Sequence, residues 1–170
     1  MDGVLLDTNI IVDLLRTYRK SRPKNQEYAY NAKKVIELFR YLISERIKRY
    51  ISCHTLKELL QYPYISEQEE NRIQNVLPKF CVTLPTTKKV ARIAGLLSRQ
   101  SADYRNYHVE DCYIAATAVA YGLPLYTRDP DDFKYVPHPT LKINYRRKTK
   151  TTNDQNRLPV LAKKVKLWGS

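Results

Sequence analysis

Short apolar segments alternate with longer segments of helical periodicity along most of the chain, and this alternation is what most constrains its fold. The apolar segments do not alternate polar with apolar residues, which indicates strands buried on both faces. We expect strands at 3–6, 49–53, 79–85, 123–127 and 140–145. Strands that alternate with helices favour a parallel sheet covered on both sides. We therefore predict an α/β fold, a three-layer α/β/α sandwich around a parallel sheet of about four or five strands.

Hydrophobic side chains recur at helical spacing in the segments between these strands. We expect helices at 9–20, 27–48, 54–62, 66–77, 87–100 and 110–121. Thr8 or Asn9 is the expected N-cap of the first helix, and Gly122 follows the last helix at the usual C-terminal position. Residues 103–109 are expected to form a polar loop. The apolar stripe of the long helix is expected to consist of Ala32, Val35, Ile36, Phe39, Leu42, Ile43 and Ile47.

The length and charge of the chain indicate one domain with a basic tail. The chain has 170 residues, with 30 Lys and Arg against 17 Asp and Glu, a net charge of +13. Residues 142–170 contribute nine of the basic residues and one acid. We expect one domain at 1–145 and a tail at 146–170. A net charge this high favours a polyanionic partner, with nucleic acid as the first candidate, and the alternative is a merely basic surface.

The cysteines and the apolar runs indicate the cellular compartment of the protein. Cys53, Cys81 and Cys112 form no CxxC pair and no zinc-site spacing, so we interpret them as small buried side chains in a reducing compartment. No apolar run approaches the ~20 residues needed to cross a bilayer. The first residues lack the basic and then apolar pattern of a signal peptide. We expect a cytoplasmic protein without membrane association.

Four acidic residues fall near the points where strands end. Asp7 directly follows the first predicted strand, and Asp129 follows the fourth after one arginine. Glu58 lies one turn into the helix after the second strand, and Asp111 lies in the first turn of the helix that leads to the fourth, at the head of its apolar face. In open parallel α/β sheets the functional site lies at the carboxyl ends of the strands. We expect these four carboxylates to converge there.

Three of these four acids also have a structural alternative. Asp7 is suited to build a turn and cap the next helix. Asp111 is suited to interact with the helix dipole, and Glu58 to be a solvated helical residue. We interpret Asp13 as a solvated or paired acid, because it shares a helix face with Arg16.

A cluster of carboxylates has a chemical consequence. Carboxylates brought together repel one another, and their pKa values rise unless a cation neutralises them. Mg²⁺ and Mn²⁺ prefer oxygen ligands of this kind. Asp7, Asp111 and Asp129, together with Glu58, therefore predict a metal-centred site. An acidic site within a basic protein suits cleavage of a phosphodiester, because the basic surface holds the phosphates while the metal acts on one of them.

Three segments resemble the successive motifs of a known family. The segments LLDTNIIVDLL (5–15), TLKELL (55–60) and EDCYIAATAVAYGLPLYTRDPDDF (110–133) resemble the motifs of PIN-domain nucleases, in family order. In particular they resemble the VapC-type toxins of toxin–antitoxin pairs. The resemblance runs from residue 3 to about residue 136 and is weakest for the middle segment.

The resemblance implies a Rossmann-like α/β/α sandwich and a Mg²⁺- or Mn²⁺-dependent endoribonuclease. The acidic quartet of the family maps onto Asp7, Glu58, Asp111 and Asp129. By this resemblance the first and third acids are direct metal ligands. The second helps to hold the metal or its water, and the fourth completes a second metal site.

The resemblance also implies supporting residues and partners. Asn9 and Thr127 match positions that support the site by hydrogen bonding. VapC-like proteins commonly dimerise, and an antitoxin whose peptide enters the active-site groove keeps them inactive. RNA as substrate, a VapB-like antitoxin and a homodimer are therefore expectations that rest on analogy.

Other functions remain open at this stage. The segment 103–109 and the tail after residue 145 make the chain longer than the compact toxins, which leaves its target and partner open. A stand-alone PIN nuclease in RNA processing and a PIN-like module that binds RNA without cleaving it are the alternatives. Haloacid-dehalogenase-like phosphatases need a second Asp where this chain has Asn9, and receiver domains need paired acids at the start. Asp131 and Asp132 are explained by turn formation, although either is a candidate addition to the site.

Overall fold

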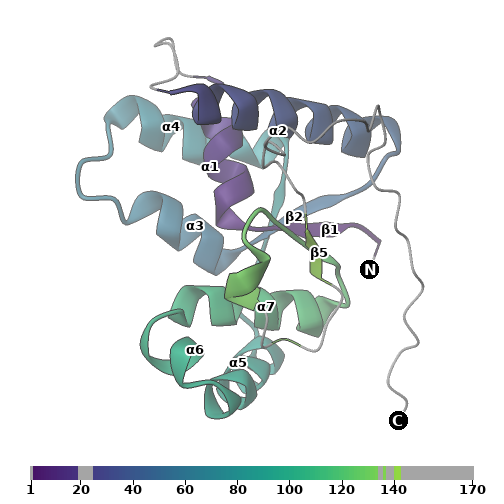
Figure 1. Cartoon of the computed structure of the whole chain (residues 1–170), viewed down its shortest axis with the longest axis vertical. Helices are drawn as coiled ribbons and strands as arrows, with labels where there is room; N and C mark the ends of the chain where they lie inside the picture. Colours follow the sequence, from purple (N-terminus) through teal and green to yellow (C-terminus); the bar gives the residue numbers. More distant parts are fainter. Residues whose placement is uncertain (1, 19–24, 134–135, 137–139, 143–170) are drawn as a thin grey trace, which may run out of the picture.

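The computed structural model describes residues 2–18, 25–133, 136 and 140–142, and its centre is a five-stranded sheet (Figure 1). The strands are β1 (Val4–Leu6), β2 (Arg49–Ser52), β3 (Val82–Leu84), β4 (Leu125–Thr127) and β5 (Thr140–Lys142). They lie in the order β3-β2-β1-β4-β5, and every neighbouring pair is parallel. The predicted parallel sheet is therefore confirmed. The predicted tail at 146–170 lies outside the described residues.

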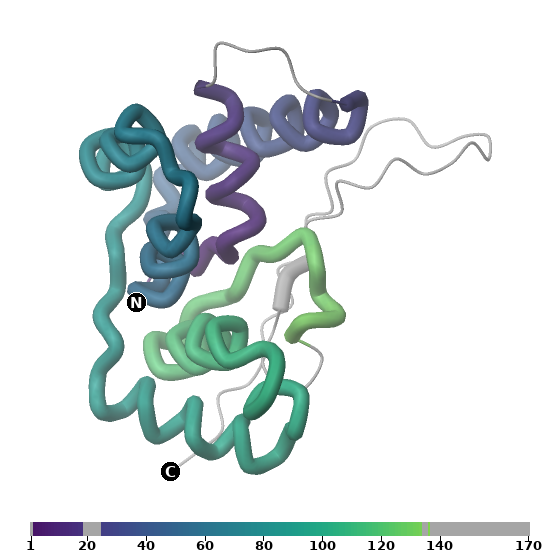
Figure 2. The backbone as a smooth tube through the Cα atoms, turned by 90° about the vertical axis from the view of Figure 1, so that its left-hand side faces the viewer, coloured from purple at the N-terminus to yellow at the C-terminus, as the bar shows by residue number. Residues whose placement is uncertain are grey.

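Helices cover both faces of this sheet. They are α1 (Thr8–Arg16), α2 (Gln26–Ser44), α3 (Cys53–Leu60), α4 (Glu67–Asn75), α5 (Lys88–Gln100), α6 (Ala102–Asn106) and α7 (Val109–Tyr121), with 3₁₀ turns η1 (Leu77–Lys79) and η2 (Pro130–Phe133). Figures 1 and 2 show α1 and α2 on one side of the sheet and α5, α6 and α7 on the other. The predicted three-layer α/β/α sandwich is confirmed. No helix among the described residues is long and apolar enough to cross a membrane.

The sheet separates two hydrophobic cores, as the pleat of its strands requires. In β1, Val4 and Leu6 pack in the core with α1 and α2, whereas Leu5 packs in the core with α5 and α7. Because Leu5 and Leu6 are both fully buried, each stabilises the fold by about 1.5–3 kcal/mol relative to an exposed position. This two-sided burial explains why the strand is apolar throughout.

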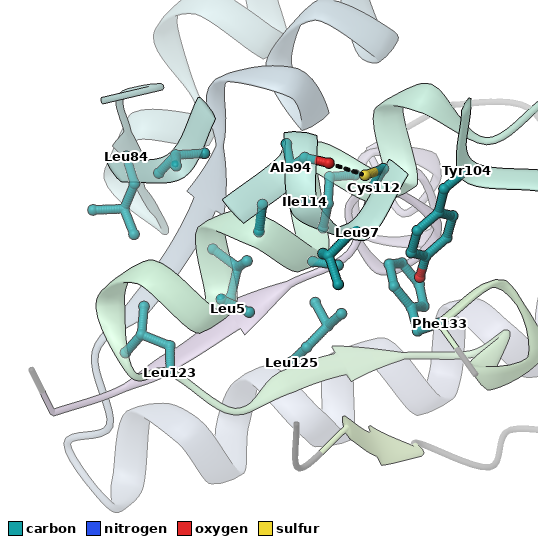
Figure 3. Packing of buried hydrophobic residues seen from close by; sticks show 14 of the residues in the cluster. Leu5, Leu84, Ala94, Leu97, Tyr104, Cys112, Ile114, Leu123, Leu125 and Phe133 are labelled. Atoms are coloured by element: carbon teal, nitrogen blue, oxygen red, sulfur yellow. Dashed lines mark hydrogen bonds between the residues drawn. The ribbon is translucent and has the colours of Figure 1, made fainter. Parts of the chain in front are cut away.

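The core on the α5 side brings α7 close to α5 (Figure 3). Alanines fill much of the buried face of α7, and Cys112 Sγ lies 3.4 Å from the carbonyl oxygen of Ala94 on α5. Cys112 and Cys81 are buried and Cys53 is half-buried, and all three are free thiols. The close helix contact holds the first turn of α7, which carries Asp111, against the sheet.

The prediction of a polar loop at 103–109 is wrong, because residues 102–106 form α6. The side chain of Ser101 caps this helix by accepting a hydrogen bond from the backbone N–H of Tyr104 at 3.3 Å. The side chain of Tyr104 is 1% exposed and packs beside Phe133 (Figure 3). Its burial supplies the stability that a five-residue helix lacks on its own.

The predictions for the long helix α2 are partly wrong. The helix ends at Ser44 rather than at residue 48, because Arg46 adopts a left-handed backbone conformation with φ 55°. A glycine usually marks such a helix end, and its absence here left no signal in the sequence. Ile36 and Ile43, which we expected in the apolar stripe, are exposed, and Leu38 is buried in their place.

Candidate active site

Asp7 lies at the carboxyl end of β1, where the chain turns into α1. Asp7 is the N-cap of α1, so the prediction of Thr8 or Asn9 as the cap is wrong and the capping role given as the structural alternative for Asp7 is confirmed. One carboxylate oxygen of Asp7, Oδ1, accepts a hydrogen bond from the backbone N–H of Thr8 at 2.6 Å. The residue is 4% exposed. The helix start therefore fixes a buried carboxylate and leaves its second oxygen, Oδ2, for other contacts.

The hydroxyl of Thr127 at the end of β4 connects several groups of the site. It donates to Asp7 Oδ2 at 2.7 Å. It accepts from the side-chain amide of Asn9 at 3.1 Å and from the backbone N–H of Asp129 at 2.9 Å. The carbonyl oxygen of the Asn9 side chain in turn accepts from the backbone N–H of Arg128 at 3.2 Å. Asn9 and Thr127 thus link the end of β1 to the turn that carries Asp129.

Glu58 reaches the same region from α3, which packs against both α1 and α7. The hydroxyl of Thr8 donates a hydrogen bond to Glu58 Oε2, so α3 is tied to the first residue of α1. Burial raises the pKa of Glu58, and the charges of Asp111 and Glu110 raise it further. Glu58 is therefore not the solvated helical residue of the structural alternative.

Asp111 lies in the first turn of α7, and its Oδ2 is 3.0 Å from Nδ1 of His108, the N-cap residue of that helix. Burial raises the pKa of Asp111, the contact with His108 lowers it, and the charges of Glu110 and Asp129 raise it. His108 is a contact that the sequence analysis missed. Its position three residues before Asp111 in a helix start was the available signal.

Asp129 and its neighbours complete the acidic region. Asp129 is exposed, and its charge contributes to the raised pKa values of Asp111 and Asp132. Burial is the main cause of the raised pKa of Asp132, followed by the charges of Asp111 and Asp129. Asp131 is exposed in the same 3₁₀ turn, η2. Of the two acids interpreted as turn formers, Asp132 thus lies within electrostatic range of the site.

Asp7 is the most deeply buried of the four acids, and the charges of two others act on it. Burial raises its pKa from 3.8 to about 7, opposed by the hydrogen bond from Thr127 and reinforced by the charges of Asp111 and Glu58. The structure therefore brings Asp7, Glu58, Asp111 and Asp129 into one electrostatic group at the carboxyl end of the sheet, where α1 starts (Figure 1). Ionised carboxylates in such a group repel one another, and a cation that neutralises them reduces this repulsion.

The fit of this group to a metal ion rests on its donor chemistry. Within the described part of the chain, no group of three or more His, Cys, Asp and Glu side chains is arranged to hold a metal ion as it stands. Oxygens of Glu58 and Asp111 are instead held by Thr8 and His108. The donors are nonetheless all carboxylates, and the raised pKa values of Asp7, Glu58 and Asp111 are those that a divalent cation would lower. The residues therefore fit a hard divalent cation.

A second polar cluster, which the sequence analysis missed, joins α3 to α7 beside the acids. Glu110 accepts from Lys57 Nζ with Oε1 at 2.5 Å, and its Oε2 lies 2.5 Å from His54 Nδ1. The ring of His54 stacks on that of Tyr113, with centroids 4.0 Å apart and an interplanar angle of 8°. Lys57 and Glu110 each precede a site acid in sequence, but nothing in their spacing predicted that they would meet.

Asp13 is the remaining acid of the first motif, and one of its two interpretations is wrong. It is 1% exposed and not solvated. It is a paired acid, since Arg16 Nη1 lies 3.3 Å from Oδ1 and Arg128 Nε lies 3.2 Å from Oδ2.

A family model now decides the classification: the PIN-domain model matches residues 4–139, most of the chain. The chain belongs to the PIN-domain family. PIN domains are nucleases, and PIN nucleases generally use divalent metal ions. The family expected from the three sequence motifs is therefore confirmed.

Solved structures of the same fold agree with this membership of the PIN family. FitAcB from Neisseria gonorrhoeae is 23% identical with a TM-score of 0.59. VapBC2 from Rickettsia felis, in complex with a DNA fragment from the VapBC2 promoter, is 19% identical with a TM-score of 0.61. DNA-bound VapBC from Salmonella typhimurium is 21% identical with a TM-score of 0.60. Each match covers 82% of this PIN domain chain and 96% of the matched chain. A search of curated proteins found no match.

Proposed function

We propose that this PIN domain is a Mg²⁺- or Mn²⁺-dependent endoribonuclease and the toxin of a VapBC-type toxin–antitoxin pair. The observation that carries the proposal is the buried carboxylate of Asp7, whose pKa of about 7 is raised by burial and by the charges of Asp111 and Glu58. A buried carboxylate beside other acids is costly unless a cation neutralises it, and such groups cluster at functional sites.

The four acids have distinct roles in this proposal. Asp7, Asp111 and Asp129 hold the cation, and Glu58 helps to hold it or its water. When bound, the cation lowers the pKa of a water molecule and stabilises negative charge on the phosphate oxygens. Glu58 suits its role because it stands at the edge of the group, half-buried and anchored by Thr8.

Asn9 and Thr127 are supporting residues in this proposal. Their hydrogen bonds hold the Asp7 carboxylate and the backbone of Asp129 in a fixed relation. The buried hydroxyl of Thr127 bonds both the carboxylate of Asp7 and the backbone N–H of Asp129. The supporting residues therefore align the cation site from inside the protein, away from the substrate.

The charge of the chain supports a nucleic-acid substrate. The net charge is +13, and the segment 146–170 carries eight Lys and Arg and one Asp. We infer that this basic tail adds sequence-independent contacts to phosphates. Deleting 146–170 is then expected to weaken RNA binding at low salt more than it slows cleavage, and an unchanged salt dependence of binding would remove the tail from the interface.

The similar structures support an antitoxin as the partner, because they are structures of VapBC and FitAB pairs. A homodimer is part of the same proposal, by analogy with VapC-like toxins. The chain extends beyond the matched region, since the matches cover 82% of it. The alternative is a stand-alone PIN nuclease that processes RNA without an antitoxin, which would have the same fold and the same site.

Incubation of the purified full chain with total RNA tests the activity. We expect cleavage with Mg²⁺ or Mn²⁺, none with EDTA, and none by Asp7→Asn. The matched control is Asp2→Asn, the same change at an exposed acid, which should cleave like the parent. Single-stranded DNA in a parallel reaction tests the choice of RNA. RNA binding without cleavage in any divalent cation would show a binding module instead.

Growth of a bacterial host that expresses the chain separates the toxin from the stand-alone nuclease. A toxin arrests growth in the parent form and not as Asp7→Asn. Cleavage of RNA in the purified system without any growth defect in the host would leave the nuclease assignment standing and contradict the toxin.

A further inference from the structure

Asp13 and Arg128 form an ion pair that joins α1 to the turn after β4. Arg128 Nε lies 3.2 Å from Asp13 Oδ2, and the Asp13 side chain is 1% exposed. The contact is an ion pair rather than an aligned hydrogen bond, because both atoms are buried without a hydrogen-bond partner. The backbone N–H of Arg128 also donates to Asn9 Oδ1. The backbone N–H and the side-chain Nε of Arg128 are therefore both held in place. The residue lies between the site residues Thr127 and Asp129 in the chain.

The two arginines that face Asp13 differ in what else they contact. Arg16 lies 3.3 Å from Asp13 Oδ1, and its guanidinium carbon is 4.2 Å from the centre of the Tyr28 ring. It is thus engaged on two sides. Arg128 faces Asp13 with Nε, and within the described residues its two terminal nitrogens make no hydrogen bond. Its side chain is 26% exposed.

The position of the pair places a fixed positive charge near the acids but not among them. Asp7 caps α1, and Asp13 lies six residues further along the same helix. At 1.5 Å per residue this separation is about 9 Å along the helix axis. Four carboxylates repel an approaching phosphodiester, so a cation held at this distance offsets part of that repulsion.

We propose that Arg128 binds a phosphate of the RNA strand that neighbours the scissile phosphate, and that Asp13 is a positioning residue which holds its guanidinium there. The inference rests on the proposed nuclease function. A guanidinium can face a carboxylate through Nε and a phosphate through the rigid fork of its terminal nitrogens at once, whereas an ammonium group is a compact point charge without that fork. The charges of one strand are spaced about 3.4 Å along the axis of a DNA duplex, and by that measure the contact falls roughly one to three nucleotides from the cleaved bond.

Cleavage kinetics of the full-length chain test this role. The substrate is a fluorescein-labelled single-stranded RNA of about 12 nucleotides that carries a cleavage site found in the total-RNA experiment. Arg128→Gln in Mn²⁺ should raise KM roughly tenfold, the loss of one charge-assisted hydrogen bond, with little change in kcat. The slope of log(kcat/KM) against log of salt concentration should become shallower by about 0.7, the value for one phosphate contact to a single strand.

Arg16→Gln is the matched control, because it also leaves Asp13 with one arginine. It should keep the KM and the salt slope of the parent. Thermal melts of both variants report folding. If Arg128→Gln does not fold, Arg128→Lys replaces it. Its single ammonium group remains with Asp13, so it should show the same rise in KM.

The outcomes separate this inference from the proposed function. A parent chain that cleaves no RNA in Mn²⁺ overturns both. A parent that cleaves, with KM and salt slope unchanged in Arg128→Gln or in its folded substitute Arg128→Lys, overturns the role of Arg128 alone. A loss of kcat at constant KM also overturns it, because Arg128 then acts only by holding Asp129.

Discussion

The hydroxyl of Thr127 donates a 2.7 Å hydrogen bond to Asp7 Oδ2 from a position 120 residues later in the chain. Both side chains are buried, at 0% and 4% exposure. A donor favours the ionised form of a carboxylate, so this bond lowers the pKa of Asp7 while burial raises it. The balance between burial and this hydrogen bond is therefore a main determinant of the pH at which Asp7 becomes negative.

Thr127→Val removes this donor without changing the shape of the side chain. The pKa of Asp7 should rise above about 7, and the backbone N–H of Asp129 should lose its acceptor. We expect a loss of about 1–3 kcal/mol in the free energy of unfolding, measured in urea. The midpoint of the pH dependence of Mn²⁺ binding should move to higher pH. Thr127→Ser keeps the hydroxyl and should keep the midpoint, whereas equal midpoints for Val and Ser would remove the hydroxyl from this role.

Asp7→Asn should change the pH dependence of stability in EDTA. The folded pKa of about 7 exceeds the unfolded value of 3.8, so the native state holds the proton more tightly. The stability that Asp7 contributes is complete below about pH 4 and is lost as the pH rises through about 7. The rise in pKa corresponds to roughly 4 kcal/mol. Asp7→Asn does not ionise, so it should match the parent near pH 4 and exceed its stability by about 1–4 kcal/mol above pH 8. The lower end of this range allows for a weaker hydrogen bond between Asn and Thr127.

The control for this measurement is Asp2→Asn, which changes an exposed acid. It should track the parent at every pH. A parallel pair of stability curves for Asp7→Asn and the parent would mean that Asp7 has the same pKa in the native and the unfolded state, and the raised pKa would then be wrong.

The affinity of the parent chain for divalent cations should rise with pH, in contrast to its stability in EDTA. A cation binds the ionised carboxylate, so binding releases a proton from Asp7 below about pH 7. The Mn²⁺ affinity should rise about tenfold for each pH unit up to that value and level off above it. Isothermal titration between pH 5.5 and 8.5 checks this, with Asp7→Asn as the variant that should show neither the affinity nor the slope. An affinity that does not vary with pH would argue against Asp7 as a ligand.

The sequence predicted the elements of the fold better than the contacts of the site. The strands and most helices follow from apolar runs and helical periodicity, which depend on neighbours in sequence. Gly122 was predicted correctly as a helix end, with φ 65°. Arg46 takes the same left-handed conformation without any signal in its residue type, so the end of α2 was misplaced. Tyr104 was assigned to a loop because its burial depends on packing against distant residues.

The same distinction applies to the candidate site. Strand ends predicted that four acids from three segments of the chain would share one edge of the sheet, and the electrostatic coupling of Asp7 to Asp111 and Glu58 agrees with that placement. The contact of Arg128 with Asp13 depends on how α1 lies over the turn after β4. No spacing rule within one segment encodes such a contact, because the two residues come from opposite ends of the domain.

Three glycines should respond differently to alanine. Gly95 lies in α5, where a Cβ would meet no described atom within 4 Å beyond the backbone of its own helix, so Gly95→Ala should stabilise the chain by about 0.5–1 kcal/mol. Gly122→Ala should destabilise it by about 1–2 kcal/mol through its positive φ alone. At Gly3 a Cβ would lie 2.5 Å from the backbone oxygen of Lys48, so Gly3→Ala should cost more than Gly122→Ala. Thermal melts give the order, at about 2–4 °C per kcal/mol, and a reversal between Gly95 and Gly122 would contradict it.

Glu110→Gln tests whether the cluster between α3 and α7 stabilises the site. Burial raises the pKa of Glu110, but the bonds from Lys57 and His54 outweigh it, so the folded pKa is lowered. Its contribution is therefore present above the unfolded pKa of about 4.5 and lost in acid. Lys57 is 54% exposed and solvent screens its charge, so we expect a loss of only about 0.5–1.5 kcal/mol at pH 7.

The matched control is Glu37→Gln, which breaks the 2.7 Å pair with Lys34 inside the single helix α2. That pair joins neighbouring turns and not two helices, so its loss should cost at most about 0.5 kcal/mol. Glu110→Gln should also weaken Mn²⁺ binding, because Glu58 and Asp111 lie next in sequence to the residues that the cluster joins, whereas Glu37→Gln should not. Equal Mn²⁺ affinities for the two variants would show that the cluster holds the helices together without aligning the acids.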